Sequence, residues 1–413
     1  MSKALYTIIM ALMAMVSPFI SFIFALRTYK NYISQFFLLV FAYFFGFYCG
    51  HFHDLDGHYY EFMQYYVGAS FIDIISNPLT FAHGHDIYHF LIKYIVSRFT
   101  TSSQVFGGVA CVCHYFLFLV FFNQFRPYFK NRMNLISGLL LITVCLLVEF
   151  WWYSNMRFWA GGFFFAAMYL KYINSGKKIY FIWSLFCPLF HYSLIALDVA
   201  LLLNLILNII PKVFRYLLLG FAIFVRSLNV DFVPLLLKYV PWAKENLSMG
   251  VVNKTTRKSV LNYMQQYRET GNLVYTSRPA IILGIGVLIL ILFKILRIPK
   301  DKNLVQVYYM FLTIFTMANF GYADMFFYNR ISLVAYVFLW AFIFMMSVKY
   351  QAYFQGRTLT FAIILLPLIM YLFITPIAQV RQYVLHPELL FGNFFMEWDG
   401  NALDIDYHRR LIR

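Results

Sequence analysis

The sequence predicts an all-helical protein that crosses a membrane about twelve times. Of its 413 residues, 62% are hydrophobic and only 12% are charged, whereas roughly a quarter of the residues are charged in a typical soluble domain. Several apolar runs reach the ~20 residues that a spanning helix needs. Basic residues gather in short segments between these runs, as is usual for loops on the cytoplasmic side of a membrane. We therefore expect lipid to surround most of the chain.

The apolar runs set the order of the expected helices. The first run has no small-residue cleavage site after it, so we expect a spanning helix there rather than a removed leader. The candidate spans are residues 4–26, 33–50, 103–123, 133–151, 158–173, 178–190, 193–210, 213–230, 279–297, 303–320, 328–348 and 358–377.

Residues 178–210 could form one long helix or two short ones. Lys177 lies at the start of this stretch and Lys212 follows its end, and basic residues favour the cytoplasmic side. Two short helices with a turn near Pro188 and His191 place both ends on that side, whereas one helix does not. We therefore predict two.

With this choice, the cytoplasmic loops are short and contain a single acid, Asp301. The outer face then receives both termini and the longer segments 51–102, 231–278 and 378–413, within one domain of residues 1–413. The basic residues assigned to the cytoplasmic loops are Arg27, Lys30, Arg126, Lys130, Arg132, Lys171, Lys177, Lys178, Lys212, Arg215, Lys294, Arg297, Lys300, Lys302, Lys349 and Arg357.

The net charge of +16 therefore reads as an orientation signal, and we expect membrane lipids rather than nucleic acid as partners. The sequence contains no Gly-rich phosphate loop and no cytoplasmic domain for a nucleotide. Any substrate should bring its own activation energy and should be reachable from the bilayer. Within 51–102, residues 86–98 predict a short amphipathic helix at the interface, with one face formed by Ile87, Leu91, Tyr94, Ile95 and Arg98.

Residues 51–61 form the first group of chemically active side chains at the outer face. This stretch is a candidate general base, a clamp for sugar hydroxyls or a metal site; the alternative is a hydrated loop. The residue types suit zinc, but no ligand spacing stands out, so we expect no metal and no cofactor. The titratable residues are His51, His53, Asp54, Asp56, His58 and Glu61.

Three further stretches reach the outer face. Arg157 begins a span beside several tryptophans, where a guanidinium is costly unless it is paired or binds an anion such as phosphate; the alternatives are an interfacial anchor or a partner for Glu149. His191 lies at the predicted turn and could accept a proton from a hydroxyl. Asp324 and Arg330 flank the outer start of another helix. They could form a local ion pair there, or Arg330 could bind phosphate as a second clamp.

These motifs and their order resemble the EpsG-like family of exopolysaccharide and O-antigen polymerases, the Wzy-type enzymes. The residues that carry the resemblance are Asp56 and Tyr60, R-F-W-A-G at 157–161, F-H-Y-S at 190–193 and N-R-I-S-L at 329–333. The resemblance implies a GT-C-like fold and a site on the periplasmic face of a bacterial inner membrane. It also implies a substrate, an oligosaccharide linked to undecaprenyl diphosphate, and pathway partners such as a flippase and a chain-length regulator.

In such enzymes a growing glycan moves from undecaprenyl diphosphate onto a hydroxyl of the next lipid-linked repeat. Arg157 and Arg330 would stabilise the diphosphate, and His191 or Asp56 would take the proton. We expect a single displacement that inverts the anomeric centre. We also expect sugar contacts from Asp54, Tyr60, Asp324 and Arg278, the last in a basic outer loop that could cover an anionic substrate. The alternatives are an O-antigen ligase, which needs the same clamp, and a flippase or transporter.

Overall fold

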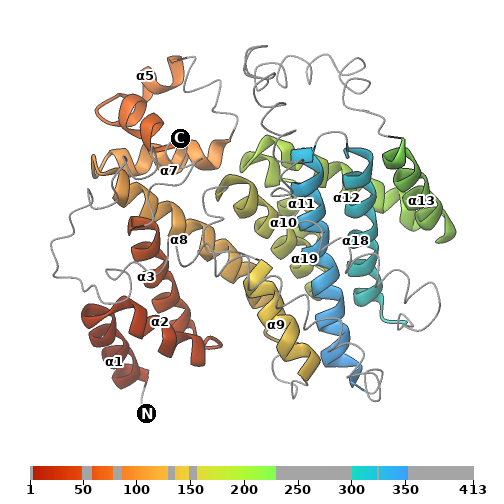
Figure 1. The fold of residues 1–413 in the computed structure, drawn as a ribbon, viewed down its shortest axis with the longest axis horizontal. Coiled ribbons are helices and arrows are strands. Elements are labelled where there is room, and N and C mark those ends of the chain that lie inside the picture. The colour runs from red at the N-terminus through yellow and green to blue at the C-terminus, as the bar shows by residue number, and fades with distance from the viewer. Residues whose placement is uncertain are drawn as a thin grey trace, which may run out of the picture.

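The computed structural model describes residues 3–48, 58–77, 86–128, 135–147, 156–228, 300–322 and 325–351. All regular secondary structure in these ranges is helical (Figure 1), which confirms the predicted fold class. By length and composition, helices at Ser103–Phe125, Tyr192–Ile209 and Arg330–Lys349 can cross a membrane. The chain is therefore a helical membrane protein. Twelve spans stay a prediction, since candidates such as 279–297 and 358–377 lie outside the described residues.

The predicted span 4–26 is wrong, because the chain folds back on itself there. Helix α1 (Lys3–Val16) ends at Ser17, which is extended (φ −157°, ψ 111°) and caps α2 (Pro18–Arg27). The Tyr6 hydroxyl lies 2.6 Å from that of Thr28, 22 residues away, whereas one continuous helix would separate them by about 33 Å. The two helices form a hairpin against α3 (Tyr32–Tyr48).

Two apolar cores meet along α8 (Ser103–Phe122). Its first half packs with α3, the π-helix η1 (Phe62–Tyr66) and α7 (Ile87–Ser97). Its second half packs on the larger core around α19 (Met325–Lys349), whose spanning segment is completely surrounded by protein. The other helices of that core are α9 (Leu135–Leu147), α10 (Met156–Ser175), α11 (Lys178–Ser184), α12 (Ile195–Ile209), α13 (Val213–Ser227) and α18 (Lys302–Phe320).

The predicted turn near Pro188 and His191 is confirmed. Two short 3-10 turns, Cys187–Leu189 and Tyr192–Leu194, separate α11 from α12. Helix α11 runs back along α10, as the ring contacts of Phe181 with Tyr172 and of Phe190 with Phe164 show. Helix α12 then reverses direction again, which brings the Asn204 side chain within 3.2 Å of the Tyr169 hydroxyl. The tip packs closely on Gly161, where an added Cβ would lie only 2.7 Å from Phe190 Cβ. A larger residue at 161 would push the tip away from α10.

Helix α7 confirms the predicted amphipathic helix and lies crosswise to α19 (Figure 1). Its predicted apolar face remains accessible, since Ile87, Leu91 and Ile95 are each about half exposed. The opposite face is buried against α8 and η1 and carries His89 and Lys93. This arrangement suits a helix that presents its apolar side to lipid and its polar side to protein.

Arg215 does not lie in a cytoplasmic loop as predicted; it is buried in the bundle. It is only 2% exposed, and its guanidinium donates to Asn204 Oδ1 (2.8 Å), Asn208 Oδ1 (2.7 Å) and Thr313 Oγ1 (3.1 Å). It also lies 4.2 Å from the centroid of the Tyr309 ring. Burying a cation is costly unless it is hydrogen-bonded, and the bonds of the two terminal guanidinium nitrogens join α13 to α12 and α18.

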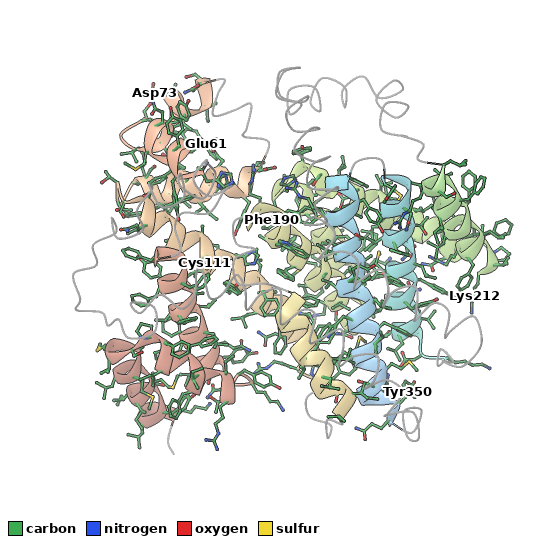
Figure 2. The ribbon with its side chains drawn as sticks, viewed as in Figure 1. Glu61, Asp73, Cys111, Phe190, Lys212 and Tyr350 are labelled. Carbon is green, nitrogen blue, oxygen red and sulfur yellow. The ribbon has the colours of Figure 1, made fainter. Side chains whose placement is uncertain are left out.

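The bundle has two chemically different ends. At one end, Lys349 pairs with Asp301, and Asn174 of α10 donates to the Gln124 carbonyl beyond α8. Figure 2 shows Lys212 and Tyr350 toward this end and Glu61 toward the other. Apart from Arg215, the described residues assigned to cytoplasmic loops lie at helix ends or in the turns between helices. Which compartment each end faces stays a prediction.

Candidate functional site

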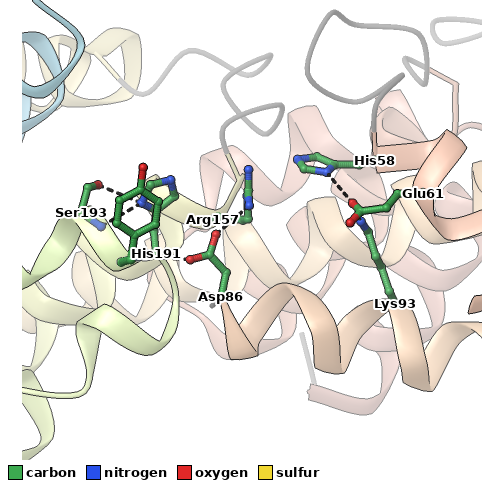
Figure 3. A network of polar contacts seen from close by, with 8 residues as sticks. His58, Glu61, Asp86, Lys93, Arg157, His191 and Ser193 are labelled. Atoms are coloured by element: carbon green, nitrogen blue, oxygen red, sulfur yellow. Dashed lines mark hydrogen bonds and ion pairs between the residues drawn. The ribbon is translucent and has the colours of Figure 1, made fainter. Parts of the chain in front are cut away.

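Asp86 connects three segments at the end of the bundle opposite to Asp301. It lies directly before α7 and its side chain is 2% exposed. One carboxylate oxygen accepts a hydrogen bond from Arg157 Nη1 (2.6 Å) at the start of α10, and the other accepts the backbone N–H of Tyr192 (3.1 Å) at the hairpin tip. Asp86 therefore holds Arg157 beside the turn that contains His191 (Figure 3).

Arg330 reaches the same place from α19. Its guanidinium carbon lies 5.7 Å from the centroid of the Phe158 ring, and that ring lies 6.0 Å from the ring of His191. Both Arg157 and Arg330 act electrostatically on His191. Arg157, His191 and Arg330, all expected at the outer face, thus lie together at one end of the bundle.

His191 is oriented by its own turn. It is 6% exposed, and its Nδ1 accepts the backbone N–H of Ser193 (3.2 Å) and lies 2.8 Å from the Ser193 hydroxyl. Since a backbone N–H can only donate, the neutral ring carries its proton on Nε2. Burial, reinforced by the charges of Arg157 and Arg330, lowers the pKa of His191 well below its usual value. Near neutral pH the residue therefore offers an Nε2–H donor.

A second polar cluster lies farther along α7. Glu61 forms an ion pair with the fully buried ammonium of Lys93, and His58 Nδ1 lies 3.7 Å from Glu61 Oε2 (Figure 3). The ring of His89 packs edge-on against that of His58, with centroids 4.1 Å apart. Burial lowers the pKa of His58 to about 3 and that of Lys93 to about 8. Both imidazoles are consequently neutral at pH 7, because burial also depresses the pKa of His89.

Sequence reasoning missed part of this cluster. It placed His58 and Glu61 in an outer stretch, with a hydrated loop as the alternative, but residues 58–61 are helical and His58 is only 8% exposed. It described α7 by its apolar face alone. The spacing of His89 and Lys93, four positions apart in a helix, places them on one face, and that pattern could have indicated a buried polar stripe.

An apolar groove of about 290 Å³ opens between α7, α8 and the tip of the hairpin formed by α11 and α12. The rings of Tyr88 and Phe190 both line it and contact each other, with centroids 4.7 Å apart. Tyr88 follows Asp86 by two residues and Phe190 precedes His191, so two of the lining residues are close in sequence to residues of the polar site. The lining residues are Tyr88, Val112, Cys113, Phe116, Leu117 and Phe190.

Within the described residues, no other predicted site residue joins Arg157, His191 and Arg330. Tyr60 is 63% exposed and lies next to the second cluster in sequence. Asp54, Asp56, Arg278 and Asp324 lie outside the described residues. No protein-family model, curated protein or solved structure matches the chain.

Proposed function

We propose that this protein is a glycosyltransferase that polymerises lipid-linked oligosaccharides. The observation that carries the proposal is the meeting of Arg157, Arg330 and neutral His191 at one end of a membrane bundle. Two guanidinium groups suit a diphosphate. The apolar groove lined by Tyr88 and Phe190 suits the isoprenoid chain that carries the diphosphate.

The reaction follows from these roles. The hydroxyl of the acceptor sugar attacks the anomeric carbon of the donor, the bond from that carbon to the diphosphate oxygen breaks, and the diphosphate leaves as an anion. Arg157 and Arg330 stabilise the charge that develops on it. A single displacement inverts the anomeric centre.

The proton of the attacking hydroxyl needs an acceptor. In the structure, Nδ1 of His191 is already engaged by Ser193, so Nε2–H acts as a donor to the sugar or diphosphate. Of the two expected bases, this favours Asp56 as the proton acceptor and gives His191 a role in orienting and stabilising the substrate. The site faces the periplasm in this proposal, on the side that the loop-charge pattern leaves outside.

The transporter alternative predicts ionisable groups along a path through the membrane. Arg215 of α13 is buried, and its terminal guanidinium nitrogens donate to side chains of the packed helices α12 and α18 rather than toward a path. An O-antigen ligase would use the same two arginines to bind the diphosphate, so it is a stronger alternative than a transporter.

Deletion of the gene separates these activities when surface polysaccharide is resolved on a gel. A polymerase defect leaves a single repeat attached to lipid A, whereas a ligase defect leaves full-length polymer on its lipid carrier. Complementation with Arg157→Lys should fail to restore the ladder, because an ammonium cannot copy the two parallel hydrogen bonds of a guanidinium. Arg98→Lys, at an exposed arginine outside the site, is the matched control and should restore it.

A further inference from the structure

The cluster at the buried face of α7 has the side chains of a metal site. One ligand atom each from His58, Glu61 and His89 lies within 4.8 Å of the other two. The residues come from two separate elements, the helical stretch before η1 and α7. Two imidazoles and one carboxylate form a common donor set for zinc and for other divalent first-row metals.

His89 provides an independent indication. It is only 5% exposed, and its Nε2 is buried without a hydrogen-bond partner among the described residues. A buried polar atom left without a partner is costly, and its ring lies directly against that of His58. A metal ion between the two rings would satisfy this nitrogen.

Lys93 is the competing partner of the carboxylate. Its ammonium binds Glu61 Oε2, which leaves Oε1 as a metal ligand with Lys93 as an outer hydrogen-bond donor, an arrangement in which second-shell groups orient a ligand. The positive charge of Lys93 opposes the metal, so its removal should tighten binding by roughly tenfold or more at this short range.

We propose that His58, Glu61 and His89 bind one divalent transition-metal ion, with zinc favoured by the ligand set. The ion would fasten residues 58–61 to α7, and α7 begins directly after Asp86, which holds Arg157. Its role is positional: it fixes the helix on which the arginine depends. Binding is independent of the polymerase activity, so failure of one proposal does not decide the other.

The test uses the full-length chain purified in detergent, stripped with a chelator and titrated with Zn²⁺ against a competing chromophoric chelator. We expect one ion per chain for wild type. His89→Ala and Glu61→Gln should weaken binding by more than the roughly 10- to 100-fold that outer-shell changes cost. His114→Ala, which removes a buried histidine of α8 outside the cluster, should still bind one ion. Lys93→Met should bind more tightly than wild type.

Two results would overturn the proposal. One is a stripped wild-type protein that binds no Zn²⁺ at micromolar concentrations. The other is a set of cluster variants that bind it as tightly as wild type. If His89→Ala does not fold, Co²⁺ added to wild type and to Glu61→Gln decides the question: a visible absorption band for wild type that is weaker in the variant supports the site, and identical spectra refute it.

Discussion

The ion pair between Asp86 and Arg157 should couple these residues strongly. Its atoms lie 2.6 Å apart, and the two side chains are 2% and 27% exposed. Two unit charges about 4 Å apart attract by ~4 kcal/mol at the effective dielectric constant of such sites. The exposed part of Arg157 can be solvated when the pair is broken, which reduces the expected coupling free energy to about 2–3 kcal/mol.

The assay is a double-mutant cycle with Asp86→Asn and Arg157→Gln, in which the free energy of unfolding is measured in mixed micelles. Asparagine keeps an oxygen that can accept the Tyr192 N–H, so the cycle reports mainly on the charge pair. A matched cycle on Asp301 and Lys349, whose lysine is 47% exposed, should give less than about 1 kcal/mol. Equal coupling in both cycles, or additive effects at Asp86 and Arg157, would refute the reasoning.

Other variants test the site and its surroundings. His191→Gln should keep part of the polymerase activity and His191→Ala should lose it, because Gln can still donate a hydrogen bond; equal loss in both would point instead to a base. Since the pKa of His191 is lowered on folding, the unfolded chain binds more protons, and stability should fall as pH drops below about 6.5; in unfolding measured across pH, His191→Gln should reduce that slope and leave the part due to His58 and His89. Cys113→Trp should fill the apolar groove and raise KM for the lipid-linked substrate with little change in unfolding free energy, whereas unchanged KM would remove the groove from substrate binding. Arg215→Met should destabilise the bundle by about 3–5 kcal/mol, because it leaves the polar groups around the guanidinium without their donor, and unfolding within 1 kcal/mol of wild type would contradict this.

Composition and loop charge predict much of this fold. The need for Lys177 and Lys212 to lie on one side of the membrane predicts the reversal at His191, because a charge left in lipid costs more than a helix break at Pro188. The hairpin at Ser17 was missed because residues 4–26 are apolar enough and long enough for one span. The break there depends on Ser17 capping α2 and on the proline that follows, a local effect that hydropathy does not report.

The site was predicted less completely, for a physical reason. Arg157, His191 and Arg330 stand out as single polar residues near the ends of apolar runs. Asp86, His89 and Lys93 do not, because their importance depends on contacts with distant parts of the chain, such as Asp86 with the Tyr192 backbone. Arg215 was misplaced for the same reason, since its partners in α12 and α18 are not visible from its position after Lys212.

Polymerisation by the purified protein tests the central claim most directly. The wild-type chain, supplied with a defined oligosaccharide repeat on undecaprenyl diphosphate, should produce a ladder of longer lipid-linked glycans and release undecaprenyl diphosphate. Arg157→Lys and Arg330→Lys should each release far less, while Arg98→Lys should match wild type. A wild-type protein that leaves the repeat unextended under conditions where it remains folded, or lysine variants that polymerise at the wild-type rate, would contradict the claim that these guanidinium groups act on a lipid diphosphate.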